Sequence, residues 1–250
     1  VGVGLSVFGE RTGYGTSAFA ARGMQITPGY ENCDLTMDPS GDIIARVGIC
    51  AQGQGISTTL SQIIADQLGL EIENINIIQG DTDNTPYGWG TFASRSVVIS
   101  GGACQLSAVK LSKKIKQIAS FYLQCSENNL LFDGGNVINR KTNSYLSLKT
   151  IARKFYHSNH EIKELVGSDL SVSSSYDPDG TFSNACHVAK VEIDFLTGNI
   201  KVDKYFVIED AGKLINPKIV DGQIIGGVIQ GIANSLFEEI KYDEKGTILT

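Results

Sequence analysis

Apolar residues that recur about once per helical turn, with polar residues between them, predict three helices. The first begins at Ser57 and is ended by Gly69, the second covers about 102–124, and the third covers about 216–239. Their apolar stripes comprise Leu60, Ile63, Ile64 and Leu68; Leu111, Ile115, Ile118 and Tyr122; and Ile225, Val228, Ile229, Ile232, Leu236 and Phe237. The lysines of the second helix fall mostly on its other faces, which indicates a solvated surface.

Turn-forming residues between short runs predict two β-hairpins. The segment Asn32–Cys50 turns at Asp38-Pro39-Ser40-Gly41, and the segment His187–Ile208 turns at Thr197-Gly198-Asn199. A further strand is expected over 75–78, before a long loop rich in glycine and threonine that ends near Ser96.

The two hairpins belong to an internal repeat. Their turn glycines, Gly41 and Gly198, lie 157 positions apart, and the loop glycines Gly55 and Gly212 have the same offset. Each unit has the order strand, turn, strand, loop, helix, and a period of this length is not that of a solenoid. The repeat predicts two related lobes whose loops, each leading into a helix, face a common ligand.

The lobes suggest a division of the chain into three segments. We expect a first lobe over 1–125, a more polar connecting segment over 126–184 and a second lobe over 185–250. The connecting segment contains a serine-rich loop before Asp177-Pro178-Asp179-Gly180.

Composition excludes several classes of protein. With 42% apolar and 19% charged residues the chain is neither disordered nor a disulfide-stapled small fold, and a net charge of −6 argues against non-specific binding of nucleic acid. No apolar stretch would span a membrane and the first residues lack the order of a signal peptide, so we expect a cytoplasmic protein. The 5 cysteines have no metal-ligand spacing, which predicts reduced and mostly buried thiols.

Two glycine-rich segments before predicted helices are the candidate binding residues. Gln52-Gly53-Gln54-Gly55 follows a strand and opens a helix, so its N–H groups and the helix dipole suit an anionic phosphate. The loop from Gly80-Asp81-Thr82-Asp83 to Gly90-Thr91-Phe92-Ala93-Ser94-Arg95-Ser96 combines small residues with hydroxyls and one guanidinium, which suit phosphate oxygens. The alternative for each segment is a tight turn that needs glycine for its φ angle. The two loops together favour a phosphorylated ligand.

A nicotinamide-dinucleotide fold is a competing interpretation. Gly53-Gln54-Gly55 precedes a helix, and Glu71 or Glu73 follows at about the required distance. Thr58, however, occupies the third glycine position, and a hairpin precedes the motif in place of a βαβ unit. The motifs of P-loop hydrolases and serine-elbow hydrolases do not occur.

Four motif-bearing segments follow one another along the chain: Ala51–Leu60, Gly80–Asp83, Gly90–Ser96 and Ile215–Gly231. Together they resemble the large, molybdopterin-binding subunit of the molybdenum hydroxylases, the family of xanthine dehydrogenase, aldehyde oxidase and carbon monoxide dehydrogenase. The resemblance that they carry extends over nearly the whole chain. The resemblance implies an α+β molybdenum cofactor-binding domain with two lobes of related strand-hairpin-helix repeats.

The resemblance also implies a cofactor and the residues that bind it. A molybdopterin dinucleotide, commonly the cytosine form in bacterial and archaeal members, is expected at the glycine loops and helix N-termini. The matching positions are Gln52, Gly53, Gln54, Thr91, Ala93, Ser94, Arg95 and Ser96 in the first lobe, and Ala211, Asn216 and Ile219 in the second. Because the metal in this family is held through the pterin, no protein metal ligand is expected.

The implied function is the cofactor-binding part of a multi-subunit molybdenum hydroxylase that acts on an aldehyde, a purine-like heterocycle or carbon monoxide. The family's amino-terminal half and base glutamate have no counterpart in these residues, so no catalytic residue is assigned and the isolated chain is expected to be inactive. Expected partners are a chain carrying that half, iron–sulphur and flavin subunits and a small-molecule substrate, without nucleic acid or membrane. The alternatives are a non-catalytic split or degenerate assembly subunit and, less favoured, a nicotinamide dinucleotide-binding protein.

Overall fold

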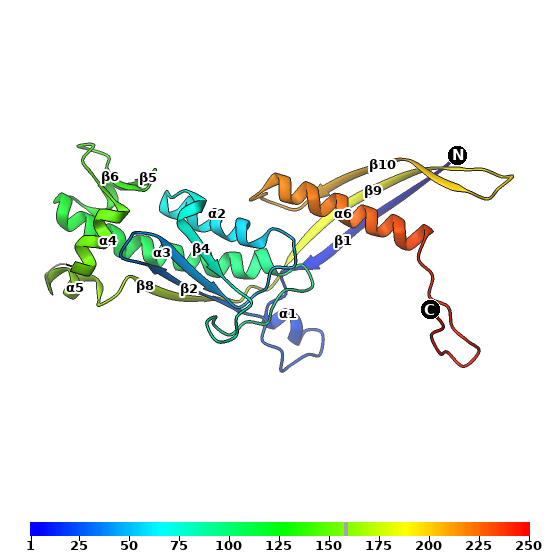
Figure 1. The fold of residues 1–250 in the computed structure, drawn as a ribbon, viewed down its shortest axis with the longest axis horizontal. Coiled ribbons are helices and arrows are strands. Elements are labelled where there is room, and N and C mark those ends of the chain that lie inside the picture. Colours follow the sequence, from blue (N-terminus) through cyan, green and yellow to red (C-terminus); the bar gives the residue numbers. More distant parts are fainter. Residues whose placement is uncertain (158–159) are drawn as a thin grey trace. The chain divides into compact units, whose positions relative to one another are not determined.

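The computed structural model describes residues 1–157 and 160–250, which form two compact units (Figure 1). Unit 1 comprises Val1–Glu10 and Ser183–Thr250, and unit 2 comprises Arg11–Phe182. Each unit combines helices with a β-sheet, which confirms the α+β class.

A mixed sheet of four strands forms the centre of unit 2. Its order is β4 (Ile75–Ile78), β3 (Ile43–Val47), β2 (Glu31–Met37) and β8 (Ser171–Tyr176). β2 pairs antiparallel with β3 and β8, whereas β3 and β4 are parallel. Every second residue of β2 and β3 is buried, as the period of a strand with one face on the core requires.

Two helices pack on this sheet and contribute to its core. In α2 (Ile56–Leu68), Leu60, Ile64 and Leu68 are fully buried, and Gly69 ends the helix at a φ of 61°. Helix α3 (Ser96–Leu123) begins before the expected start at about residue 102. That expectation was wrong because Gly102 lies inside the helix, where a Cβ atom would come within 2.2 Å of the Tyr176 ring.

The segment expected as a connection over 126–184 belongs to unit 2 up to Phe182. It forms a small antiparallel sheet and two helices before β8: β5 (Leu130–Asp133), β6 (Asn136–Asn139), β7 (Tyr145–Ser147), α4 (Leu148–His157) and α5 (His160–Val166). The serine-rich run expected as a loop is strand β8, because β2 pairs with it from Glu31 to Thr36. The compact units therefore differ from the expected division at 125 and 184. Short elements complete the unit: α1 (Thr16–Ala20) and the 3-10 turns Ile72–Asn74 and Glu127–Asn129.

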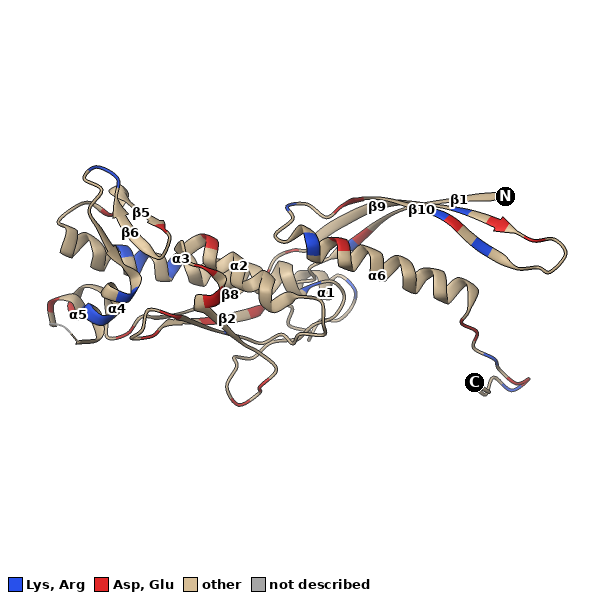
Figure 2. Cartoon of the chain, turned by 45° about the horizontal axis from the view of Figure 1, so that its top comes forward, with Lys and Arg blue, Asp and Glu red and all other residues tan. Residues whose placement is uncertain are grey.

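Unit 1 contains a three-stranded sheet and one long helix. The sheet order is β1 (Gly2–Thr12), β9 (Thr181–Ile193) and β10 (Ile200–Asp210). The end of β1 and the start of β9 extend past the border into unit 2. The predicted hairpin is confirmed by antiparallel pairing of β9 with β10. Helix α6 (Pro217–Leu236) follows, and Figure 2 shows charged residues only near its start, whereas they are frequent along β9 and β10.

The internal repeat is visible in the backbone as well as in the sequence. The turn glycines Gly41 and Gly198 have φ angles of 93° and 75°, and the loop glycines Gly55 and Gly212 have φ angles of 77° and 70°. All four take the left-handed conformation that favours glycine. The repeats differ after the loop, because α2 begins directly at Ile56 whereas α6 begins at Pro217.

In the part of the chain that the structure describes, no helix has both the length and the hydropathy needed to cross a membrane.

Candidate functional site

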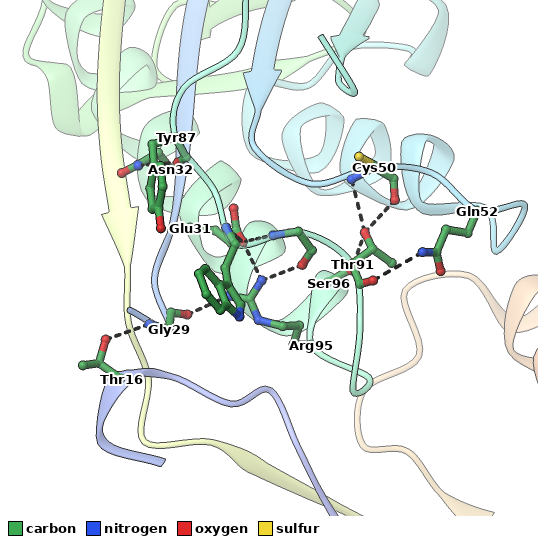
Figure 3. Close-up of polar contacts among 12 residues, drawn as sticks. Thr16, Gly29, Glu31, Asn32, Cys50, Gln52, Tyr87, Thr91, Arg95 and Ser96 are labelled. Carbon is green, nitrogen blue, oxygen red and sulfur yellow. Dashed lines mark hydrogen bonds and ion pairs between the residues drawn. The ribbon is translucent and has the colours of Figure 1, made fainter. Parts of the chain in front are cut away.

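The two predicted glycine loops of unit 2 lie against each other (Figure 3). The first glycine loop comprises Cys50–Gly55 and the second comprises Gly88–Ser96. The Thr91 hydroxyl donates to the Cys50 carbonyl at 2.6 Å and accepts from the Cys50 N–H at 3.2 Å. The Gln52 amide nitrogen donates to the Thr91 carbonyl at 3.3 Å. The structure thus brings together segments that the sequence identified separately.

The first glycine loop leaves the start of α2 without a side-chain cap. Gly55, the residue before the helix, offers no side-chain acceptor to the first N–H groups, and no acidic residue lies in the first turn. Gly53 has a φ of 91° and open space where a side chain would be. Gln54 folds back so that its Oε1 accepts from the Gln52 N–H at 2.6 Å. The positive end of the α2 dipole therefore faces an exposed loop without a carboxylate.

The second glycine loop contains two residues with uncommon backbone angles. Ala93 and Ser94 have φ angles of 47° and 54°, in the left-handed region that non-glycine residues seldom adopt. Both are exposed, and they immediately precede α3. That helix also starts without a side-chain cap and without an acidic residue in its first turn. The hydroxyl of Ser96, its first residue, donates to the Thr91 hydroxyl at 3.1 Å.

Arg95, one of the predicted cofactor contacts, is buried in the structure. The side chain is 0% exposed. Nη1 donates to Glu31 Oε1 at 2.5 Å and to the Gly90 carbonyl at 2.6 Å, and Nη2 donates to the Gly29 carbonyl at 2.7 Å. The guanidinium therefore points into the protein and holds the loop from behind.

Sequence reasoning missed Glu31, the partner of Arg95. Glu31 lies on the buried face of β2 with Cys33, Leu35 and Met37, and it is 0% exposed. A Cβ atom at Gly88 would lie 2.2 Å from Glu31 Oε2, so a side chain at that position would displace the carboxylate. The available signal was a charged residue at an inward position of an otherwise apolar strand face, which is seldom found without a partner.

The segment Gly80-Asp81-Thr82-Asp83 forms an exposed turn organised by Asp81. One carboxylate oxygen accepts from the Asp83 N–H at 3.0 Å and the other from the Asn84 side chain at 2.7 Å. These hydrogen bonds, that of Asn84 first, lower the pKa of Asp81 below its usual value. The Asp81 carboxylate therefore stabilises the turn.

The remaining three predicted residues lie in unit 1 at the start of α6. Ala211 is exposed in the loop before the helix, and Ile219 is half-buried in the first turn. Asn216 caps the helix, because its Oδ1 accepts from the Ile219 N–H at 3.1 Å, and Pro217 follows at the first helical position. Unlike α2 and α3, this helix therefore carries its own side-chain cap.

The donor set of unit 2 fits an anionic group better than a metal ion. Within residues 1–157 and 160–250, no three His, Cys, Asp or Glu side chains are grouped so that they could hold a metal. Two uncapped helix starts, exposed amides and hydroxyls and the open space at Gly53 and Gly90 offer hydrogen-bond donors and room for a close approach. Such an arrangement can hold phosphate oxygens.

Comparison with known proteins gives a consistent picture. A family model described as a molybdopterin cofactor-binding domain matches residues 1–250. The large subunit of nicotine 6-hydroxylase from Paenarthrobacter nicotinovorans is 36% identical over 253 residues, and the carbon monoxide dehydrogenase large chain of Hydrogenophaga pseudoflava is 34% identical over 251 residues. In each case the match covers 100% of this chain and 31% of the relative, so this chain spans about a third of their length.

A solved structure is similar to this chain over its whole length. Quinoline 2-oxidoreductase from Pseudomonas putida 86 has a TM-score of 0.90 and 34% sequence identity to this chain. The match covers 100% of this chain and 32% of that one.

Proposed function

Because this chain belongs to the molybdopterin cofactor-binding domain family, we propose that it binds the cytosine dinucleotide form of the molybdenum cofactor through its two glycine loops. The resemblance to the large subunits of molybdenum hydroxylases is confirmed by the same match and by the relatives. The nucleotide form and the contacting residues are our proposal.

The observation that carries the proposal is the pair of uncapped helix starts beside two joined loops. Helices α2 and α3 both begin without a side-chain cap and without an acidic residue in the first turn. Backbone N–H groups at such positions bind phosphate oxygens, and the helix dipole favours their negative charge. Thr91 and Gln52 connect the loops, so both helix starts present their donors to one pyrophosphate.

Individual residues then have different roles. Six of the residues are exposed or half-buried and would contact the dinucleotide directly: Gln52, Gly53, Gln54, Thr91, Ala93 and Ser94. Ser96 is buried and acts through its hydrogen bond to Thr91. Arg95 acts from inside by holding the loop, through its bonds to Glu31 and Gly90. Ala211, Asn216 and Ile219 stay predictions that rest on the family resemblance.

The reaction of the whole protein is also a proposal, since this chain spans about 31% of the relatives' length. We propose the oxidative hydroxylation of an aldehyde, a purine-like heterocycle or carbon monoxide. The bound molybdenum cofactor would supply the redox chemistry, and the residues of this chain would bind and orient it. The partners would be a chain with the rest of the large subunit and iron–sulphur and flavin subunits, and the chain alone would not turn over.

A charge placed at the start of α2 tests cofactor binding separately from stability. Thr58 is exposed in the first turn of α2. Thr58→Glu adds a negative charge that favours the helix dipole but repels a phosphate, whereas Thr58→Gln has nearly the same shape without the charge. In the complex purified from its own host, we expect molybdenum and released cytidine monophosphate to fall at least several-fold for the glutamate variant and to stay unchanged for the glutamine variant.

The same measurement separates the alternatives. Equal molybdenum and nucleotide content in both variants would contradict binding at α2. Wild-type complex that releases an adenine nucleotide and contains no molybdenum would favour the nicotinamide interpretation. Cofactor-loaded complex without turnover of aldehydes, purines or carbon monoxide would favour the non-catalytic assembly subunit.

A further inference from the structure

The carboxylate of Glu31 is buried at one end of an apolar strand face. It is 0% exposed, and the other inward residues of β2 are Cys33, Leu35 and Met37. Transferring a carboxylate from water to such a place is unfavourable unless it is paired and hydrogen-bonded. The contacts that compensate it all come from one segment, the second glycine loop.

Three donors of that loop converge on a single oxygen of Glu31. Oε1 accepts from the Trp89 N–H at 2.8 Å, the Gly90 N–H at 3.1 Å and Arg95 Nη1 at 2.5 Å. Because Arg95 also donates to the Gly90 carbonyl at 2.6 Å, the peptide groups on both sides of Gly90 are fixed. One carboxylate thus sets the path of the backbone in which the exposed donors lie.

The residues between these anchors are the ones in a strained conformation. Gly90 and Arg95 bracket 91–94, where Ala93 and Ser94 have φ angles of 47° and 54°. Left-handed backbone at non-glycine residues persists where the surrounding structure imposes it. Here both ends of the strained stretch are held to β2 through Glu31 and Arg95.

We propose that Glu31 is a positioning residue for the cofactor. Glu31 is buried and would not touch the dinucleotide itself. It fixes the second glycine loop in the conformation that presents Thr91, Ala93 and Ser94 to the dinucleotide. The inference rests on the proposed function. It adds that retention of the cofactor depends on a buried ion pair and not only on the exposed loop residues.

Two variants separate positioning from a merely structural role. Glu31→Gln keeps the shape but leaves the Arg95 charge unpaired, which lowers stability. The double variant Glu31→Gln with Arg95→Met removes both charges, and a buried pair can often be replaced in this way without loss of stability. If the pair served only stability, the double variant would retain the cofactor as the wild type does.

The experiment uses the whole complex and measures cofactor release, amide exchange and thermal unfolding. We expect the single and double variants to release molybdenum and nucleotide at least 10-fold faster than wild type, with the melting temperature of the double variant close to wild type. The Trp89 and Gly90 amides should exchange at least 10-fold faster in both variants in cofactor-free complex. Asp169→Asn is the control, since it breaks an exposed ion pair with Lys114 in the same unit.

Two results would overturn the proposal. One is release of molybdenum and nucleotide from the double variant at the wild-type rate. The other is fast exchange of the Trp89 and Gly90 amides in cofactor-free wild type, a result that does not depend on the folding of any variant. Failure of the proposed function looks different, because wild-type complex would then contain no molybdenum dinucleotide while the exchange measurement still reported on the loop.

Discussion

The Thr91 hydroxyl and the Cys50 main chain form a reciprocal pair of hydrogen bonds, at 2.6 Å to the carbonyl and 3.2 Å from the N–H. A side chain therefore satisfies both main-chain groups of a residue 41 positions earlier in the chain. This pair, together with the Gln52 hydrogen bond to the Thr91 carbonyl, joins the two glycine loops beside the helix starts of α2 and α3.

Thr91→Val should loosen the junction between the loops. The substitution keeps the volume but removes both hydrogen bonds to Cys50, each worth about 0.5–1.5 kcal/mol. We expect faster amide exchange at Cys50 and a several-fold higher rate of cofactor release. Thr91→Ser keeps the hydroxyl and should behave like wild type; equal release rates for valine and serine variants would contradict the role of the pair.

Gly102→Ala should destabilise unit 2 although alanine is the better helix former. The new Cβ atom would lie 2.2 Å from the Tyr176 ring, and overpacking of this kind costs about 1–3 kcal/mol. Gly101→Ala is the matched control in the same helix, because its Cβ atom would meet the end of the Ile63 side chain at 3.0 Å and Val97 at an ordinary contact distance of 3.9 Å. Urea unfolding should show the larger loss of stability for Gly102→Ala, and the reverse order would contradict the packing argument.

Asn216→Ala should weaken the start of α6 in unit 1. It removes the side-chain acceptor for the Ile219 N–H, and loss of such a cap costs about 1 kcal/mol. Asn216→Ser can cap the helix and should retain most of the stability. Amide exchange of the first turn of α6 reports the effect directly, and unchanged protection in the alanine variant would show that the cap has little effect on stability.

The Asp81 turn should lose stability in acid. The pKa of Asp81 in the folded chain is below the ordinary value of 3.8, because Asn84 and the Asp83 N–H hydrogen-bond to the ionised form. A depressed pKa means that the contribution is fully present above about pH 3.8 and is lost as the pH falls through the folded-state pKa. A carboxyl-carbon NMR titration of Asp81 should give a midpoint below 3.8, and Asn84→Ala should raise it. A midpoint that does not change in the Asn84 variant would contradict this assignment.

Elements with a local cause could be predicted from the amino-acid sequence. Helix α2 ends at Gly69 because a left-handed residue is needed there, and the turn glycines Gly41 and Gly198 recur because both hairpins need the same backbone conformation. The order and spacing of the glycine motifs also identified the family and the candidate loops. Such features depend on residues close together in the sequence, so the sequence alone predicts them.

Features that join distant residues became visible only in the folded chain. The serine-rich run 171–176 becomes a strand because β2 offers it a partner. Gly102 does not mark a helix start: it lies within α3, at a position where the Tyr176 ring leaves no space for a side chain. Glu31 and Arg95 are 64 positions apart, and only folding shows that they form a buried pair behind the loop. The physical reason is that hydrogen bonds compensate a buried charge through space: the pattern of β2 shows that Glu31 needs a partner, but only the fold shows that the partner is Arg95.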